Sequence, residues 1–102
     1  MNYAYREINS DKTLNANDRI VGVNTSAGVV AVQLPPVNTV RSGFLLIIKD
    51  ITGNAASNNI TIDADGVDQI SGAGQISIST DYASVSLVAA HAATSDKGWD
   101  II

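Results

Sequence analysis

Three aspartates within one short segment form the densest cluster of side chains that could do chemistry. Asp63, Asp65 and Asp68 flank Gly66 in a stretch with turn character. Calcium takes about six to eight oxygen ligands, so three carboxylates could supply roughly half of a site. The same carboxylates would serve equally well as acceptors of backbone N–H bonds in a turn, and no glutamate completes an EF-hand pattern. The residue types of this segment favour a role in a turn over a calcium site. The three aspartates nevertheless are the candidate metal ligands of the chain.

Asp63 and Asp65 also have the spacing of a catalytic carboxylate pair. Residues two apart in a strand lie on one face about 6.5–7 Å apart, a distance that permits glycosidase chemistry. Other catalytic groups are scarce, because the chain has one histidine, one glutamate and no cysteine. A thiolate nucleophile, a Cys-based zinc site and a two-histidine relay are therefore excluded. A domain of this size has little room for a deep cleft, and we predict neither an enzyme nor a cofactor.

The aromatic residues and the single histidine supply the candidate contact residues. Tyr3 and Tyr5 share one side of an extended N-terminal segment, and we expect them at an interface. His91 would place three imidazoles around an axis if three copies met there, although a lone surface histidine is the commoner case. We expect Trp99 in the core with its N–H bonded, and Tyr82 to be partly buried.

Length and charge limit the partners of this chain. It has 102 residues, a net charge of −4 and a hydrophobic share of 45%. This suits one domain with one core, and six Lys plus Arg argue against binding to nucleic acid or an anionic membrane surface. No apolar run approaches the roughly 20 residues of a membrane span, so we expect no membrane insertion. Arg41, Lys49 and Asp50 are expected to be solvated charges at strand ends. A buried role for Lys49 and Asp50 is the open alternative, which their adjacent positions on opposite sides of a strand do not support.

Short β-branched runs, several of them alternating, dominate the chain, and helical periodicity is missing. They predict about eight strands, over 3–7, 20–23, 29–34, 44–48, 60–62, 76–78, 85–88 and 99–102. Turn residues recur every 8–12 residues or so, which is typical of all-β domains. We predict a small antiparallel β-sandwich of jelly-roll type over 18–102, preceded by a connector or edge strand over 1–17. Because exposed sheet edges with few charges self-associate, we expect a homo-oligomer, with a trimer favoured.

Several motifs follow one another in an informative order. They are LPP (34–36), IIKD (47–50), GNAASNNITI (53–62), DGVDQISGAG (65–74), ISTDYASVSLVAA (78–90) and WDII (99–102). This ordered series resembles the small β-domains of bacteriophage tail-fibre, tail-spike and other virion proteins, over about 18–102. The resemblance implies a viral structural or receptor-binding module, often trimeric, and implies no enzymatic activity.

We therefore expect a virion protein that serves as an appendage or fibre head. It would attach to the host surface through many weak contacts that sum by avidity. Other virion proteins and a host-surface glycan are the expected partners. Two alternatives remain open from the sequence: a capsid decoration or head-stabilising protein, and a carbohydrate-binding module appended to an enzyme.

Overall fold

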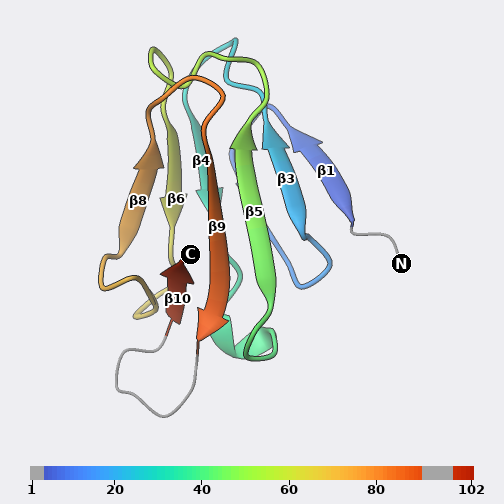
Figure 1. The fold of residues 1–102 in the computed structure, drawn as a ribbon, viewed down its shortest axis with the longest axis vertical. Helices are drawn as coiled ribbons and strands as arrows, with labels where there is room; N and C mark the ends of the chain where they lie inside the picture. The colour runs from blue at the N-terminus through green and yellow to red at the C-terminus, as the bar shows by residue number, and fades with distance from the viewer. Residues whose placement is uncertain (1–3, 91–97) are drawn as a thin grey trace.

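The structure, a computed structural model, describes residues 4–90 and 98–102, whose regular elements are short β-strands and one 3-10 helix joined by loops (Figure 1). The all-β prediction is confirmed, and none of the described residues forms a helix that is long and apolar enough to span a membrane. The described elements are β1 (Tyr5–Ile8), β2 (Lys12–Thr13), β3 (Ile20–Val23), β4 (Val30–Gln33), the 3-10 helix η1 (Val37–Thr39), β5 (Leu45–Asp50), β6 (Ile60–Asp63), β7 (Gln69–Ile70), β8 (Gln75–Ile78), β9 (Ser84–Ala90) and β10 (Gly98–Ile101).

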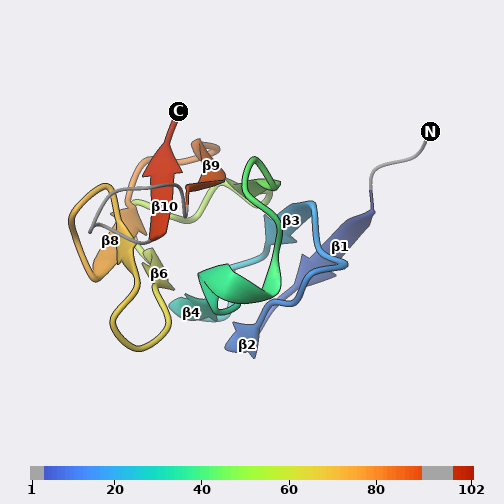
Figure 2. The same ribbon diagram turned by 90° about the horizontal axis from the view of Figure 1, so that it is seen from below.

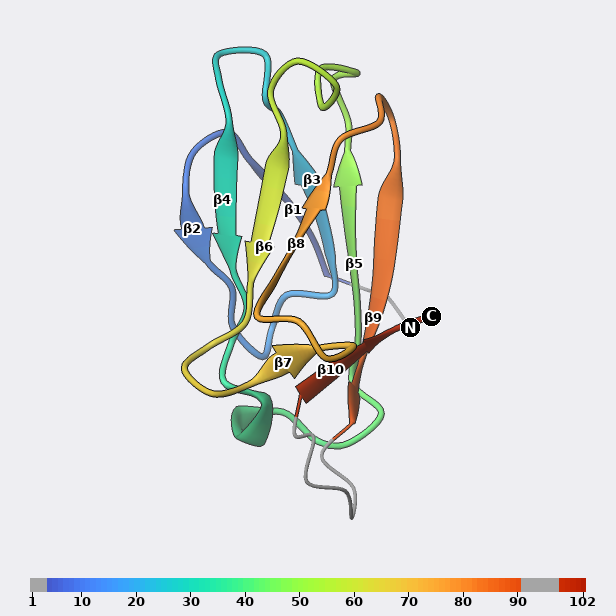
Figure 3. The same ribbon diagram turned by 90° about the vertical axis from the view of Figure 1, so that its left-hand side faces the viewer.

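Successive strands from β1 to β6 alternate between two sheets, which form separate layers when viewed from the side or from below (Figures 2 and 3). The six-stranded sheet has the order β1-β3-β5-β9-β10-β7, and the four-stranded sheet has the order β2-β4-β6-β8. Neighbours among β1, β3 and β5, and among β2, β4 and β6, are parallel. Each pass of the chain through this region therefore adds one strand to each sheet.

The predicted antiparallel, jelly-roll pairing is wrong for most of the described strands. Five of the eight pairings described are parallel, and only β5–β9, β9–β10 and β6–β8 are antiparallel. A jelly roll is built from antiparallel Greek keys, so its connectivity differs from this winding. The physical reason is that alternating hydrophobicity determines which side of a strand is buried, while strand direction depends on where each loop leads.

The two sheets enclose one hydrophobic core. Alternate residues of the strands point into it, which is the consequence of their period of two. The N-terminal segment also contributes, because Ile8 and Leu14 are buried, and β1 and β2 are edge strands of the two sheets. The core residues from the central strands are Val21, Val23, Val30, Val32, Leu46, Ile48, Ile60, Ile62, Leu87 and Ala89.

Trp99 lies in this core, as predicted, with 1% of its surface exposed. Its ring meets that of Phe44 edge to face, with ring centroids 6.2 Å apart and an interplanar angle of 74°. The expected hydrogen bond is absent, because the indole N–H has no partner among the residues that the structure describes.

Candidate functional site

The outer face of the four-stranded sheet is polar. Residues paired across neighbouring strands project on the same side of a sheet. Because Val30, Val32, Ile60 and Ile62 point inward, the residues between them point outward. Register places Thr13, Gln33, Asp63 and Gln75 in one outward row, and Ala31, Thr61 and Ser77 in the next. This face has the composition of an ordinary solvated surface.

By the same argument, part of the outer face of the six-stranded sheet is apolar, while Ser86 lies opposite Ile47 and Asp100 lies opposite Val88 on that face. Register aligns Tyr5, Ile20 and Ile47 in one row, and Leu45 with Val88 in the next. We call these five residues the apolar outer face. Leu45 is 38% exposed, and a hollow of about 180 Å³ lies on this face between Arg19, Ile20, Leu45 and Ile47. Aliphatic side chains on both sides of one sheet are typical of a sheet that another layer covers.

Tyr5 extends this face to the sheet edge. Its hydroxyl donates a hydrogen bond to Glu7 Oε2 over 3.0 Å and lies above Gly22, where a Cβ would come within 2.6 Å of the phenol oxygen. The bond to Glu7, burial and the Glu7 charge raise the pKa of the Tyr5 hydroxyl. Of the other predicted contact residues, Tyr3 and His91 lie outside the described residues.

Three loops gather at one end of the molecule, at the top of Figure 1. We call this the three-loop end; it comprises residues 24–29, 51–59 and 79–83. Hydrogen bonds join the loops directly. The Asn58 amide donates to the Thr25 carbonyl over 2.7 Å, and the Ala56 N–H donates to Asp81 Oδ1 over 2.9 Å. The two contacts tie the middle loop to both of its neighbours.

Asp50 holds two of these loops together, and the prediction that it is a solvated charge is wrong. Its side chain is fully buried at the end of β5. Oδ1 accepts the N–H groups of Thr52 and Gly53, each over 3.1 Å. Oδ2 accepts those of Ala55, over 3.1 Å, and Tyr82, over 2.9 Å. One carboxylate therefore satisfies four backbone donors from two loops, which is why a charge is tolerated in this position.

The pKa of Asp50 reflects two opposing effects. Burial raises it, because the charged form loses hydration, while the four backbone N–H donors lower it by stabilising the carboxylate. The donors prevail, and the pKa of Asp50 lies below its ordinary value of 3.8. Asp50 is thus an anion at neutral pH whose role is to organise the backbone.

Tyr82 is the most unusual residue of this end. The N–H of Ala83 donates to the carbonyl of Thr80 over 3.1 Å, which closes a β-turn, and Tyr82 occupies its third position with φ of 62°. Positive φ there defines a type II turn and normally selects glycine or asparagine. A bulky residue in this conformation costs on the order of 1–3 kcal/mol. Tyr82 is also 61% exposed, so the prediction that it is partly buried is wrong.

The strained tyrosine is held from several sides. Asp50 accepts its N–H, and the Lys49 ammonium donates to its carbonyl oxygen. The same ammonium lies 5.9 Å from the ring centroid, within the range of a cation–π contact. The outer part of the ring lies over Gly53, where a Cβ would approach two ring carbons to 2.5 Å. Only glycine at position 53 leaves room for the ring.

The structure does not gather the three candidate metal ligands. Asp63 points outward from β6, in the row with Gln33. Asp65 and Asp68 lie in the following loop, where Asp68 Oδ2 accepts the N–H of Val37 over 2.8 Å and joins this loop to η1. Among the described residues there is no cluster of three or more His, Cys, Asp or Glu side chains that could bind a metal.

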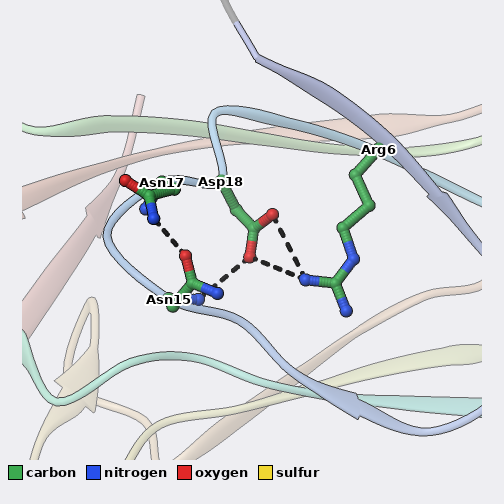
Figure 4. A network of polar contacts seen from close by, with 4 residues as sticks. All are labelled: Arg6, Asn15, Asn17 and Asp18. Atoms are coloured by element: carbon green, nitrogen blue, oxygen red, sulfur yellow. Dashed lines mark hydrogen bonds and ion pairs between the residues drawn. The ribbon is translucent and has the colours of Figure 1, made fainter.

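Arg6 and Asp18 form the ion pair of the N-terminal edge (Figure 4). Arg6 Nη1 lies 3.2 Å from Asp18 Oδ2, and the same oxygen accepts the N–H of Asn15 over 2.9 Å. Asn15 Oδ1 in turn accepts the N–H of Asn17 over 2.8 Å. Asp18 thereby stabilises the loop that leads into β3. Its partners account for its burial, and the network has the character of a structural contact.

Sequence reasoning gave the wrong burial for Asp50 and Tyr82, the two residues that organise the three-loop end. The sequence does contain a signal for Asp50. It is followed by Ile-Thr-Gly-Asn, and an aspartate just before such turn residues is typical of a turn in which the carboxylate accepts the N–H groups that follow it. For Tyr82 the residue type led to a wrong prediction of burial, because aromatic side chains are usually buried. Comparison with known proteins adds no assignment: no family model matches this chain, and no similar protein was found among curated proteins.

Proposed function

We propose that this chain is a structural and adhesion module of a virion appendage, such as the head of a bacteriophage tail fibre, and that it works as a homotrimer. The observation that carries the proposal is the difference between its two outer faces. One presents Thr61, Ser77 and Gln33 to solvent, and the other presents Ile20, Leu45 and Ile47. The resemblance of the ordered motif series to phage virion proteins supports the viral assignment.

An apolar sheet face in water favours association. Each fully buried Ile, Leu or Val side chain contributes on the order of 1.5–3 kcal/mol relative to full exposure. The side chains of the apolar outer face are only half-buried, so covering them in an assembly gains part of that amount at each position. Sister copies are suitable partners, because a chain with charged residues at only 16% has few groups that oppose such contacts.

Association of three copies through the six-stranded sheet would also determine which way the three-loop end faces. Most strands run along the long axis of the molecule (Figure 1), while β7 and β10 cross it (Figure 3), and the three-loop end lies at one end of that axis. Three copies that share the six-stranded sheet around a parallel axis would present three such ends on one side. Multivalent contact of this kind converts a weak affinity per site into firm attachment.

The test is a pair of lysine substitutions on opposite outer faces. Ile47→Lys places a charge in the middle of the apolar outer face, and Thr61→Lys places the same charge on the polar face as a matched control. Multi-angle light scattering after size exclusion should give a monomer for the first variant and the wild-type oligomer for the second. Equal masses for the two variants would refute the proposed interface.

A further inference from the structure

We propose that Tyr82 is the platform of a carbohydrate-binding site at the three-loop end, on which a neutral pyranose ring stacks. This inference rests on the proposed adhesive function and gives it a site and a ligand class. The ring is exposed beside loops whose side chains are largely amides and hydroxyls, including Asn54, Ser57 and Asn58.

The first argument is that the fold itself does not need this side chain. The type II turn at 80–83 requires positive φ at its third position, which glycine or asparagine would supply without strain. Tyr82 as a whole residue is 61% exposed and therefore adds little to the core. A strained residue that the surrounding contacts enforce, without a gain in packing, is a feature that clusters at binding sites.

The second argument is that the ring is oriented in advance. Contacts from Asp50 and Lys49 hold the backbone on both sides of the ring, and Gly53 lies beneath its outer part. A ring that is already held in place loses little conformational entropy when a ligand stacks on it. Without Gly53 there would be no room for this arrangement.

The third argument concerns the chemistry of the ligand. An aromatic face matches the C–H surface of a sugar ring, and nearby polar groups fix its orientation through its hydroxyls. Asp81 is exposed and directly precedes Tyr82 in the chain, and the buried Asp50 carboxylate accepts the backbone N–H of Tyr82. The ammonium of Lys49 also lies near the ring, and it is engaged with the Tyr82 carbonyl. Two carboxylates, Asp81 and Asp50, therefore outnumber the one ammonium, Lys49, which is already engaged. This balance of charge disfavours an acidic sugar and favours a neutral one.

The experiment is a titration of the isotopically labelled full chain, followed by amide NMR, with soluble neutral oligosaccharides of glucose, galactose and N-acetylglucosamine. A hyaluronan oligosaccharide serves as the acidic arm. We expect at least one neutral sugar to shift the Tyr82 and Gly53 amide signals. Tyr82→Asn, which tolerates positive φ, should bind that sugar about tenfold more weakly or worse while its melting temperature stays within a few degrees of wild type. Val67→Asn, at an exposed apolar residue of the opposite end, should bind it as the wild type does.

The proposal is overturned if no neutral sugar shifts these signals, if only the acidic oligosaccharide binds, or if Tyr82→Asn keeps full affinity. This failure is distinguishable from failure of the proposed assembly, because the titration measures affinity per site. The monomeric Ile47→Lys variant should bind the sugar with unchanged affinity per site. A wild-type chain that binds sugar as a monomer would refute the assembly and leave the platform intact.

Discussion

Replacing Asp50 by asparagine tests whether one carboxylate organises the three-loop end. The carboxylate accepts four backbone N–H groups, two on each oxygen. An asparagine offers one acceptor oxygen, and its NH2 group would face the other two donors. Two bonds to a charged group are lost, each contributing about 1.5–3 kcal/mol. Since some of these N–H groups are only partly buried, water relieves part of the cost, and we expect a loss of about 3 kcal/mol in the free energy of unfolding.

The assay is urea unfolding followed by circular dichroism at pH 7, with Asp63→Asn on the polar outer face of β6 as the matched control. The control should change the free energy of unfolding by less than about 0.5 kcal/mol. A loss below about 1 kcal/mol for Asp50→Asn would refute the role assigned to this carboxylate.

The pH dependence gives a second readout of the same group. Because the folded-state pKa of Asp50 lies below its ordinary value of 3.8, the folded protein binds the proton less readily than the unfolded chain. The stabilisation is therefore fully present above the unfolded pKa and is lost as pH falls through the lower folded pKa. The difference in stability between wild type and Asp50→Asn should narrow as the pH falls from 7 towards 3. A difference that stays constant would contradict this assignment.

Two glycine substitutions test close backbone approaches. A Cβ at Gly98 would overlap the backbone carbonyl oxygen of Gln69, so Gly98→Ala should separate β10 from β7 and lower the free energy of unfolding by roughly 2–3 kcal/mol in thermal or urea melts. Gly74→Ala, where nothing lies within 4 Å of the new methyl group, should stay within about 0.5 kcal/mol, and equal effects would argue against the β7–β10 contact. Gly53→Ala should cost less in a Tyr82→Asn background than in wild type, because only the wild type adds a clash with the ring to the backbone strain. A double-mutant cycle should give a coupling energy above about 0.5 kcal/mol, and strict additivity would place the ring elsewhere.

The strands could be predicted from the sequence because of the alternation of apolar and polar residues. This alternation marks a strand in the sequence, and it also determines which side chains of the strand are buried. In Ile60–Asp63 every second residue is apolar and buried, and the same holds for Val30–Gln33. The predicted ranges for these strands agree with the structure to within a residue or two. Strands of two residues, β2 and β7, were not predicted, since two residues are too few to display a period.

Strand direction could not be predicted from the same pattern. Ile20 and Ile47 are partners in a parallel pair, and Leu45 and Val88 are partners in an antiparallel one, yet all four occupy ordinary strand positions. What differs is the route of the connecting chain, which crosses to the other sheet between β3 and β5. Loop composition restricts such routes only weakly, so an antiparallel arrangement and the observed winding have similar sequence signatures.

The arrangement of residues around Tyr82 at the three-loop end could not be predicted from the sequence for a different reason. The adjacent residues Lys49 and Asp50 face opposite sides of β5, so no sequence pattern pairs them. In the folded chain both contact Tyr82, which lies more than thirty positions away. Contacts of this range arise only when the loops of different strands meet at one end of the sheets. The sequence could suggest the turn residues but not their meeting point.

Sedimentation equilibrium of the purified chain at micromolar concentration tests the central claim most directly. If the apolar outer face is covered by sister copies, the fitted mass should be about three times the 10.6 kDa of one chain and should fall to one copy in Ile47→Lys. A wild-type chain that sediments as a stable monomer throughout this range would contradict the account.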